Sequence, residues 1–385
     1  MKDSKKVWYG KGFKLGVLGG GQLGRMLIQE AIDWNVHVYC LDPDPNAPCS
    51  QIANNFTNGS ITDYQTVFDF AKDKDVVTVE IENVNIEALE EVEKMGVKVF
   101  PQPNVLRIIR DKGIQKQFYK KHGLPTSDFS LINSKEELSL FDNLSPKVLK
   151  LRTGGYDGRG VKVLKSKKDI EDAFDVPCII EDYIPFEKEL AIIVARNESG
   201  DVNTFPVVEC EFSSEANLVE FLFSPAQVSD SVELKAKEIA INIIESLQMV
   251  GILAVEFFLT KEGELLINEI APRPHNSGHH TIECNVTSQF QQHLRSVLNL
   301  PLGDTSLISC GAMLNILGEK GSNGPALYGG MEFLLNEPGV FVHIYGKEVV
   351  KSFRKMGHIT LIAPTILELK QKVELIKGKL KAHSA

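Results

Sequence analysis

The most constraining stretch of the chain is residues 253–279, LAVEFFLTKEGELLINEIAPRPHNSGH. Two runs rich in β-branched and aromatic residues flank a turn-forming segment, which predicts a β-hairpin. If the turn is centred on Glu262-Gly263, Glu256 lies directly across from Glu269. Two like charges placed opposite one another repel unless a cation lies between them. Because Mg²⁺ favours one or two carboxylates together with substrate phosphates, the hairpin predicts a site for a metal and a phosphate.

Two simpler interpretations of the hairpin remain open. One glutamate can point into water, or a β-bulge can shift the register so that the two carboxylates do not meet. The residues after Glu269 favour the metal interpretation, because Arg273, His275, Asn276 and Ser277 follow closely and suit an anion.

Composition narrows the class of protein. The chain has 385 residues, of which 43% are hydrophobic and 24% charged, as in an ordinary globular protein of two or three domains. A net charge of −9 argues against a nucleic-acid-binding surface. No signal-like segment or membrane-spanning apolar run is evident, so we expect a cytoplasmic protein with no membrane partner. The six cysteines form no CxxC pair, which predicts free thiols.

A glycine-rich turn follows the first predicted strand, residues 13–19. Gly19, Gly21 and Gly24 satisfy G-x-G-x-x-G ahead of a predicted helix, and Asp42 ends the next predicted strand. This pattern is typical of a dinucleotide-binding unit. The alternative is a doubly wound domain whose turn faces another small anionic ligand.

A second predicted strand, residues 76–84, carries Glu80 and Glu82 on one side by its period of two. Acids at the carboxyl end of a parallel strand lie where open α/β sheets bind ligands. The alternative is that one of them caps the next helix.

Further along, the pattern predicts a phosphate-binding region. Residues 105–122 form a predicted basic amphipathic helix in which Lys112 is a candidate phosphate contact. A strand with Lys150, a loop with four glycines and a second strand then span residues 148–163. Glycines let backbone N–H groups approach phosphate oxygens, and a mobile loop of this kind can exclude water.

Two later regions add candidate contacts. The segment Glu181 to Ile184 can present backbone groups to a purine, and Glu189 can reach a ribose, although both acids can equally be exposed strand ends. Near the C-terminus, Lys347, Arg354 and Lys355 form a local basic cluster in an acidic chain. Such clusters are usually solvated, but a phosphate site is the alternative that we favour.

Three stretches, LGGGQLGRM, RTGGYDGRG and NEIAPRPHNSGH, together resemble the N5-carboxyaminoimidazole ribonucleotide synthetase family of ATP-grasp enzymes. The resemblance implies an α/β and α+β architecture with three parts. These are an N-terminal doubly wound (Rossmann-like) domain at 1–111, a central ATP-grasp domain at 112–302 with a lid at about 125–185, and a small β-rich cap at 303–385. It also implies a homodimer.

The resemblance implies ATP- and bicarbonate-dependent carboxylation of 5-aminoimidazole ribonucleotide through carboxyphosphate, in purine biosynthesis. The positions matching nucleotide contacts are Lys112, Lys150, Gly155, Tyr156, Asp157, Gly158, Arg159, Gly160, Val161, Glu181, Asp182, Tyr183, Ile184, Glu189, Asn268 and Glu269. Glu256 and Glu269 match the ligands of two Mg²⁺ ions, for which Mn²⁺ is a substitute. The positions that match ribonucleotide contacts are Gln22, Leu23, Glu82, Tyr156, Asp157, Arg159, Lys347, Arg354 and Lys355. The resemblance assigns bicarbonate binding to Arg273, His275 and Asn276.

Two competing functions remain testable. An NAD-dependent dehydrogenase built on the glycine turn leaves RTGGYDGRG and the Glu256/Glu269 pair unexplained. A non-catalytic nucleotide sensor on the same fold predicts a missing magnesium carboxylate or lid residue, and all of these residues are present.

Overall fold

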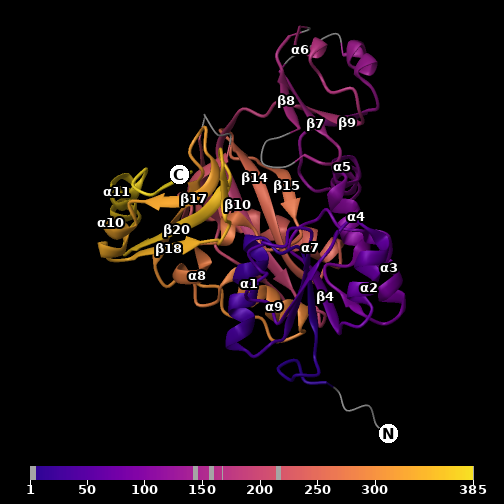
Figure 1. Ribbon diagram of the computed structural model, residues 1–385. Coiled ribbons are helices and arrows are strands. Elements are labelled where there is room, and N and C mark those ends of the chain that lie inside the picture. Colours follow the sequence, from indigo (N-terminus) through magenta and orange to yellow (C-terminus); the bar gives the residue numbers. More distant parts are fainter. Residues whose placement is uncertain (1–5, 142–145, 156–159, 167, 214–217, 385) are drawn as a thin grey trace.

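The computed structural model describes residues 6–141, 146–155, 160–166, 168–213 and 218–384. The N-terminal α/β domain lies beside a large central sheet that includes strands from the C-terminal part of the chain, and a small sheet containing β7, β8 and β9 projects from one end (Figure 1). Among the described residues, no helix has the length and apolar character needed to cross a bilayer.

The N-terminal domain is a parallel sheet with strand order β3-β2-β1-β4-β5. Its strands are β1 (Leu15–Leu18), β2 (Val38–Asp42), β3 (Asn55–Asn58), β4 (Val76–Val79) and β5 (Lys98–Val99), and its helices are α1 (Gln22–Asp33), α2 (Tyr64–Ala71) and α3 (Ile86–Lys94). Because β1 and β4 are neighbours, the glycine turn after β1 lies beside the residues that follow β4. The predicted strand at 76–84 ends early, at Val79.

The prediction of one helix over residues 105–122 is wrong. The structure has two helices, α4 (Pro103–Arg110) and α5 (Lys112–Lys121), separated by Asp111 in extended conformation. The Asp111 carboxylate caps α5 by accepting the Gly113 and Ile114 N–H groups, and it forms an ion pair with Arg152 at 2.7 Å. The break places Lys112 at the first position of α5, beside the lid strands.

The projecting sheet, which we call the lid sheet, has strand order β6-β9-β7-β8. Its strands are β6 (Phe129–Ile132), β7 (Lys147–Leu151), β8 (Val161–Leu164) and β9 (Cys178–Asp182), with a 3₁₀ turn at Lys135–Leu140 and α6 (Lys168–Glu171). All pairings in it are antiparallel, and Lys150 pairs with Val161 across β7 and β8. The glycine-rich loop therefore joins two adjacent strands of this sheet.

The central sheet runs in the order β15-β14-β10-β12-β13-β16-β20-β18, with β11 on β10. The strands are β10 (Phe186–Arg196), β11 (Val202–Thr204), β12 (Val208–Ser213), β13 (Leu218–Ser224), β14 (Gly251–Thr260), β15 (Leu265–Ala271), β16 (Cys310–Leu317), β18 (Val340–Ile344) and β20 (Lys355–Ala363). A three-stranded sheet is formed by β17 (Asn323–Gly329), β19 (Val349–Lys351) and β21 (Lys381–Ser384). The remaining helices are α7 (Asp230–Ser246), α8 (Thr281–Cys284), α9 (Gln289–Val297), α10 (Met331–Asn336) and α11 (Ile366–Ile376), with a 3₁₀ turn at Asn276–Gly278.

The two faces of the central sheet differ in chemistry. Leu190, Ile192 and Val194 of β10 pack into a core that includes the buried face of α7. Side chains alternate between the faces of a strand, so Glu189 points to the opposite side. The same side receives Glu256 of β14, because Leu253, Val255 and Phe257 of that strand enter the core.

A β-bulge at Asn268 determines the direction of Glu269. Near the turn, Leu259 pairs with Leu265 instead of the expected Leu266, and the register shifts between Glu256 and Phe257 so that Glu256 does pair with Glu269. Ile267 and Ile270 both enter the core although they are three residues apart. The extra residue thus allows Asn268 and Glu269 to lie together on the opposite face.

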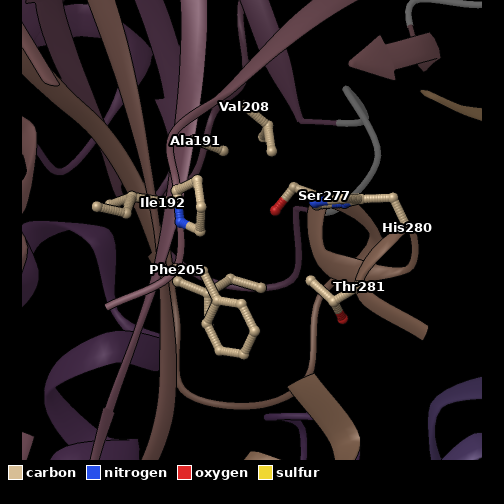
Figure 2. Close-up of a pocket in the computed structure, with 9 residues that line it drawn as sticks. Ala191, Ile192, Phe205, Val208, Ser277, His280 and Thr281 are labelled. Atoms are coloured by element: carbon tan, nitrogen blue, oxygen red, sulfur yellow. The ribbon is translucent and has the colours of Figure 1, made fainter. Parts of the chain in front are cut away.

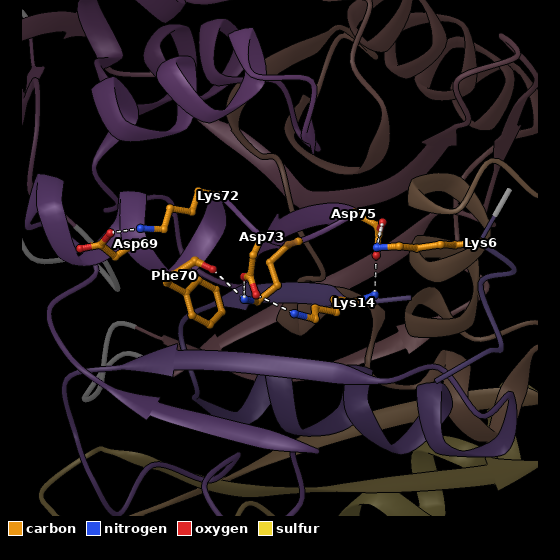
Figure 3. Close-up of polar contacts among 8 residues, drawn as sticks. Lys6, Lys14, Asp69, Phe70, Lys72, Asp73 and Asp75 are labelled. Atoms are coloured by element: carbon orange, nitrogen blue, oxygen red, sulfur yellow. Dashed lines mark hydrogen bonds and ion pairs between the residues drawn. The ribbon is translucent and has the colours of Figure 1, made fainter. Parts of the chain in front are cut away.

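Charged residues tie the N-terminal segment to the edge of the first sheet (Figure 3). The Asp75 carboxylate accepts hydrogen bonds from Lys6 Nζ and from the Lys14 backbone N–H, both at 2.8 Å. Lys14 and Lys74 both form ion pairs with Asp73. These contacts are largely solvent-exposed and give the residues before β1 a structural role.

Candidate active site

Three carboxylates lie on one face of the central sheet, contributed by Glu189, Glu256 and Glu269 from adjacent strands. Glu256 pairs with Glu269 across β14 and β15, while Glu189 and Glu256 are diagonal neighbours across β10 and β14. Burial, reinforced by the charge of Glu269, raises the pKa of Glu256 to about 7. Burial and the charge of Glu256 raise the pKa of Glu189 to about 8. The cluster therefore attracts positive charge.

Two lysines approach these acids from the lid side. Lys112 Nζ lies 2.7 Å from Glu269 Oε1, and Lys150 Nζ donates to Asn268 Oδ1 at 3.0 Å. Burial opposes ionisation of Glu269, but the charge and hydrogen bond of Lys112 outweigh it and lower the pKa of that carboxyl. The Glu269 side chain is 48% exposed, so it remains open to a ligand.

The segment from Glu181 to Ile184 connects the lid sheet to the central sheet. The Asp182 N–H donates to the Asp128 carbonyl and the Tyr183 N–H to the Pro146 carbonyl, each at 3.1 Å. Asp182 also forms an ion pair with Lys147. Two N–H groups of the segment are therefore used within the lid, which leaves fewer of its backbone groups for a ligand.

Two of the anion-binding candidates after the hairpin lie beside carboxylates: His275 is near Glu256, and Arg273 pairs with Glu82 of the N-terminal domain. His275 Nε2 is 3.7 Å from Glu256 Oε1, and Arg273 Nε is 2.9 Å from Glu82 Oε1. Burial and the charge of Arg273 lower the pKa of His275 to about 3, so its imidazole is neutral. Asn276 begins the short 3₁₀ turn that follows. Arg273 thus connects the carboxyl edge of the N-terminal sheet with the hairpin.

The glycine turn binds the protein's own carboxylates. Glu80 accepts hydrogen bonds from the N–H groups of Gly21 and Gly24 at 2.9 and 3.1 Å, and Asp42 accepts from Gly20 at 2.6 Å. A Cβ at Gly21 would lie 2.7 Å from Glu80 Oε1, so the close approach requires glycine. A pyrophosphate would have to displace two carboxylates here, and the turn is therefore unsuited to a dinucleotide. Gln22 and the buried Leu23 begin α1 directly after it.

The C-terminal basic residues divide into two groups. Lys355 is close enough to lower the pKa of both Glu256 and His275 by its charge, and Lys347 Nζ donates to the Lys355 carbonyl at 2.7 Å. Arg354 instead donates to the Val349 carbonyl at 2.7 Å. Gly346, next to Lys347, lies near the Arg25 guanidinium of α1. This end of the site is therefore framed by the first and last parts of the chain.

Part of the glycine-rich loop lies outside the described residues. Tyr156, Asp157, Gly158 and Arg159 belong to this part, so the structure does not place these four predicted site residues. Gly155 and Gly160 border it, and the exposed Val161 begins β8.

The histidines near the site do not form a metal centre. Figure 2 shows a crevice over β10 lined by Phe205, Val208, Ser277 and His280. Burial lowers the pKa of His280 to about 4, and His279 stacks on Phe290. Within the described parts of the chain, no three His, Cys, Asp or Glu side chains are arranged closely enough to hold a metal ion by themselves. Any metal at the Glu256/Glu269 pair therefore needs further ligands from water or a bound substrate.

Sequence reasoning missed Lys116, and it named Glu80 as a candidate ligand contact without its observed role as an acceptor for the glycine turn. The neighbouring positions of β1 and β4 in a doubly wound sheet could have indicated this role of Glu80. Lys116 follows Lys112 by one helical turn, a spacing that places both on one face once α5 is known to begin at Lys112.

A lid sheet and a central sheet that hold lysines over paired carboxylates define an ATP-grasp enzyme. Three protein-family models match the chain: the ribonucleotide synthetase preATP-grasp domain at residues 13–110, the ATP-grasp domain at 117–290, and the phosphoribosylaminoimidazole carboxylase C-terminal domain at 311–372. The predicted fold class is thereby confirmed.

Sequence comparison with related proteins narrows the family to which the chain belongs. It is 37% identical over 370 residues to the N5-carboxyaminoimidazole ribonucleotide synthase of Bacillus subtilis, covering 93% of each chain. It is 42% identical over 382 residues to the phosphoribosylaminoimidazole carboxylase of Saccharomyces cerevisiae, covering 95% of this chain but only 66% of the yeast protein.

Solved structures agree. The crystal structure of the Thermotoga maritima synthetase matches with a TM-score of 0.90 and 40% identity, covering 97% of this chain and 100% of the other. The Aspergillus clavatus synthase in complex with ADP and 5-aminoimidazole ribonucleotide matches with a TM-score of 0.87 and 35% identity, covering 96% and 98%. The chain belongs to the N5-carboxyaminoimidazole ribonucleotide synthetase family, which consists of ATP-dependent carbon–nitrogen ligases of purine biosynthesis.

Proposed function

We propose that the carboxylate and lysine cluster on the central sheet uses ATP and bicarbonate to carboxylate 5-aminoimidazole ribonucleotide. A bicarbonate oxygen attacks the γ-phosphorus of ATP, giving carboxyphosphate and ADP. The exocyclic amine of the ribonucleotide then attacks the carboxyl carbon, phosphate leaves, and a proton is lost from nitrogen. The supporting observation is that Lys112 and Lys150 reach the hairpin on which Glu256 and Glu269 face one another.

Phosphoryl transfer depends on positioning and charge neutralisation more than on a covalent nucleophile. Lys112 and Lys150 supply fixed positive charge, and Glu189 lies on the same face for a ribose hydroxyl. In this proposal the loop from Gly155 to Val161 covers the phosphates, and the segment from Glu181 to Ile184 borders the purine.

Glu256 and Glu269 fit two Mg²⁺ ions, with Mn²⁺ as a substitute. Their carboxylates are opposed across a strand pair, and burial together with repulsion by Glu269 raises the pKa of Glu256, a cost that a divalent cation would relieve. Asn268, brought to the same face by the bulge, adds an amide oxygen. Magnesium held by these residues would neutralise charge on the phosphate oxygens.

Arg273, His275 and Asn276 are proposed to hold bicarbonate and then carboxyphosphate. Arg273 supplies charge, while neutral His275, next to Glu256, can donate or accept a hydrogen bond. Since carboxyphosphate hydrolyses readily, closure of the lid sheet protects the intermediate from water.

The ribonucleotide is assigned to the space between the N-terminal and C-terminal regions. Gln22, Leu23 and Glu82 border it from the first domain, and the charge of Lys355 reaches the hairpin from the last strands. The further contacts proposed for this ligand are Lys347, Arg354, Tyr156, Asp157 and Arg159. We also propose a cytoplasmic homodimer with domains at 1–111, 112–302 and 303–385.

The decisive experiment is ADP release with each co-substrate omitted in turn. Release should require both bicarbonate and 5-aminoimidazole ribonucleotide, and the product should lose CO₂ on acidification as an N-carboxylate does. ADP release that is unaffected by omission of the ribonucleotide would refute the assignment.

A further inference from the structure

Helix α5 carries a second lysine, Lys116, one turn after Lys112. The Lys116 ammonium forms an ion pair with Glu181 and donates to Ser127 Oγ at 2.9 Å. Both side chains of the pair are only 3% exposed. Charges this deeply buried persist only when they are compensated.

Glu181 has two cations instead of one. Lys116 lies at its Oε1, and Lys150 Nζ lies 2.7 Å from its Oε2. Burial alone would raise the pKa of Glu181, but the two lysines outweigh it and lower that pKa to about 2. The carboxylate is therefore ionised throughout the physiological range and needs a permanent counter-ion.

Lys150 has two possible partners in this arrangement, the Glu181 carboxylate and a bound triphosphate. It is shared between Glu181 and Asn268, the residue beside the proposed metal ligand Glu269. When Lys150 turns its ammonium toward a triphosphate, it weakens its contact with Glu181. Without another cation, that movement would leave a buried carboxylate uncompensated, and this cost would reduce nucleotide affinity.

We propose that Lys116 is a positioning residue that neutralises Glu181 and thereby frees Lys150 to bind the ATP phosphates. The proposal rests on the proposed function, because it takes Lys150 as a phosphate contact. It makes a prediction that a purely structural role does not. Loss of Lys116 should weaken binding of ligands with β- and γ-phosphates much more than binding of AMP.

The test compares Lys116→Met with the control Lys74→Met by calorimetric titration of Mg²⁺-ATP and of AMP into the full chain. The Lys74 side chain is also little exposed, at 6%, and it forms an ion pair with Asp73, which is 50% exposed, in the N-terminal domain. For Lys116→Met we expect the Kd of ATP to rise about ten-fold or more, the order of one lost buried charge contact, while that of AMP changes less than about two-fold. Unchanged ATP affinity, or equal losses for ATP and AMP, would overturn the proposal.

A second variant covers the case in which Lys116→Met does not fold. In a Glu181→Gln background the buried charge is absent, so adding Lys116→Met should change ATP affinity less than about three-fold. A larger loss there would also overturn the proposal. Lys150→Met tests the underlying assignment separately: if ATP affinity survives that change, the proposed role of Lys150 fails whatever Lys116 does.

Discussion

Glu256 and Glu269 face one another across β14 and β15 because a single extra residue, Asn268, interrupts the ladder between them. Regular alternation from Ile267 would turn Glu269 into the apolar core. The bulge instead sends Ile270 inward and leaves Glu269 on the side of Lys112. The electrostatics of the site thus follow from one local irregularity.

Glu269→Gln should leave the fold intact and abolish bicarbonate-dependent ADP release, because it removes a charge from the proposed metal site without changing side-chain volume. The matched control is Glu262→Gln, at the exposed turn of the same hairpin, which should retain full activity. ADP release by a coupled assay measures both variants. Normal turnover of Glu269→Gln would contradict the metal assignment.

The pH dependence of stability should report the raised pKa of Glu256. A carboxyl group whose pKa is higher in the folded than in the unfolded protein favours folding at low pH, and this contribution is lost as pH rises from about 4.5 through about 7. Without divalent ions, Glu256→Gln should therefore gain stability over the parent at pH 8, by up to about 3 kcal/mol, and little at pH 4. Denaturant unfolding at both pH values measures the difference; an equal effect at both would exclude this origin.

Magnesium affinity should rise with pH across the same range, because protons compete for Glu256. The titration is Mg²⁺ activation of ADP release between pH 6 and 8, at saturating ATP. We expect the activation constant to fall as Glu256 ionises, near pH 7. A constant that does not vary with pH would mean that this carboxylate does not bind the ion.

Lys355→Ala and Arg354→Ala should raise the KM for the ribonucleotide far more than the KM for ATP, as expected for contacts with one substrate. Lys351→Ala is the control, since its side chain is exposed on β19, shortly before Arg354 in the chain. The structure favours a larger effect for Lys355, whose charge reaches Glu256, than for Arg354, which donates to Val349. Equal changes in both KM values would remove these residues from the ribonucleotide site.

Glu80→Ala should destabilise the protein by about 1–3 kcal/mol, because the Gly21 and Gly24 N–H groups lose their acceptor.

NAD should not stabilise the parent protein in thermal unfolding, since Glu80 and Asp42 occupy the donors of the turn. A clear NAD-dependent rise in Tm would restore the dinucleotide interpretation.

The sequence predicted the parts of the site that depend on local pattern. Residue types over a few positions are enough to predict the hairpin, the glycine turn and the lysine before the glycine-rich loop. The predicted opposition of Glu256 and Glu269 is confirmed, but the register assumed near the turn was not the observed one. Free thiols were also correctly expected at all six cysteines.

What escaped prediction depends on contacts distant in sequence. Lys116 looked like one cation among many on a basic helix, and only the fold brings it to Glu181, 65 positions later by residue number. The break at Asp111 was not predicted because the helical pattern continues through it, although Asp111 caps α5 locally and also pairs with Arg152. The role of Glu80 required knowing that β4 lies next to β1.

The continuous pairing of β13 with β16 has a consequence for dissection of the chain. A fragment ending before β16 would present β13 as a bare edge of the sheet, with unpaired backbone groups that invite intermolecular association. Aggregation of such a truncated protein would then reflect the unpaired edge of β13. It would not show that the nucleotide-binding part is unstable.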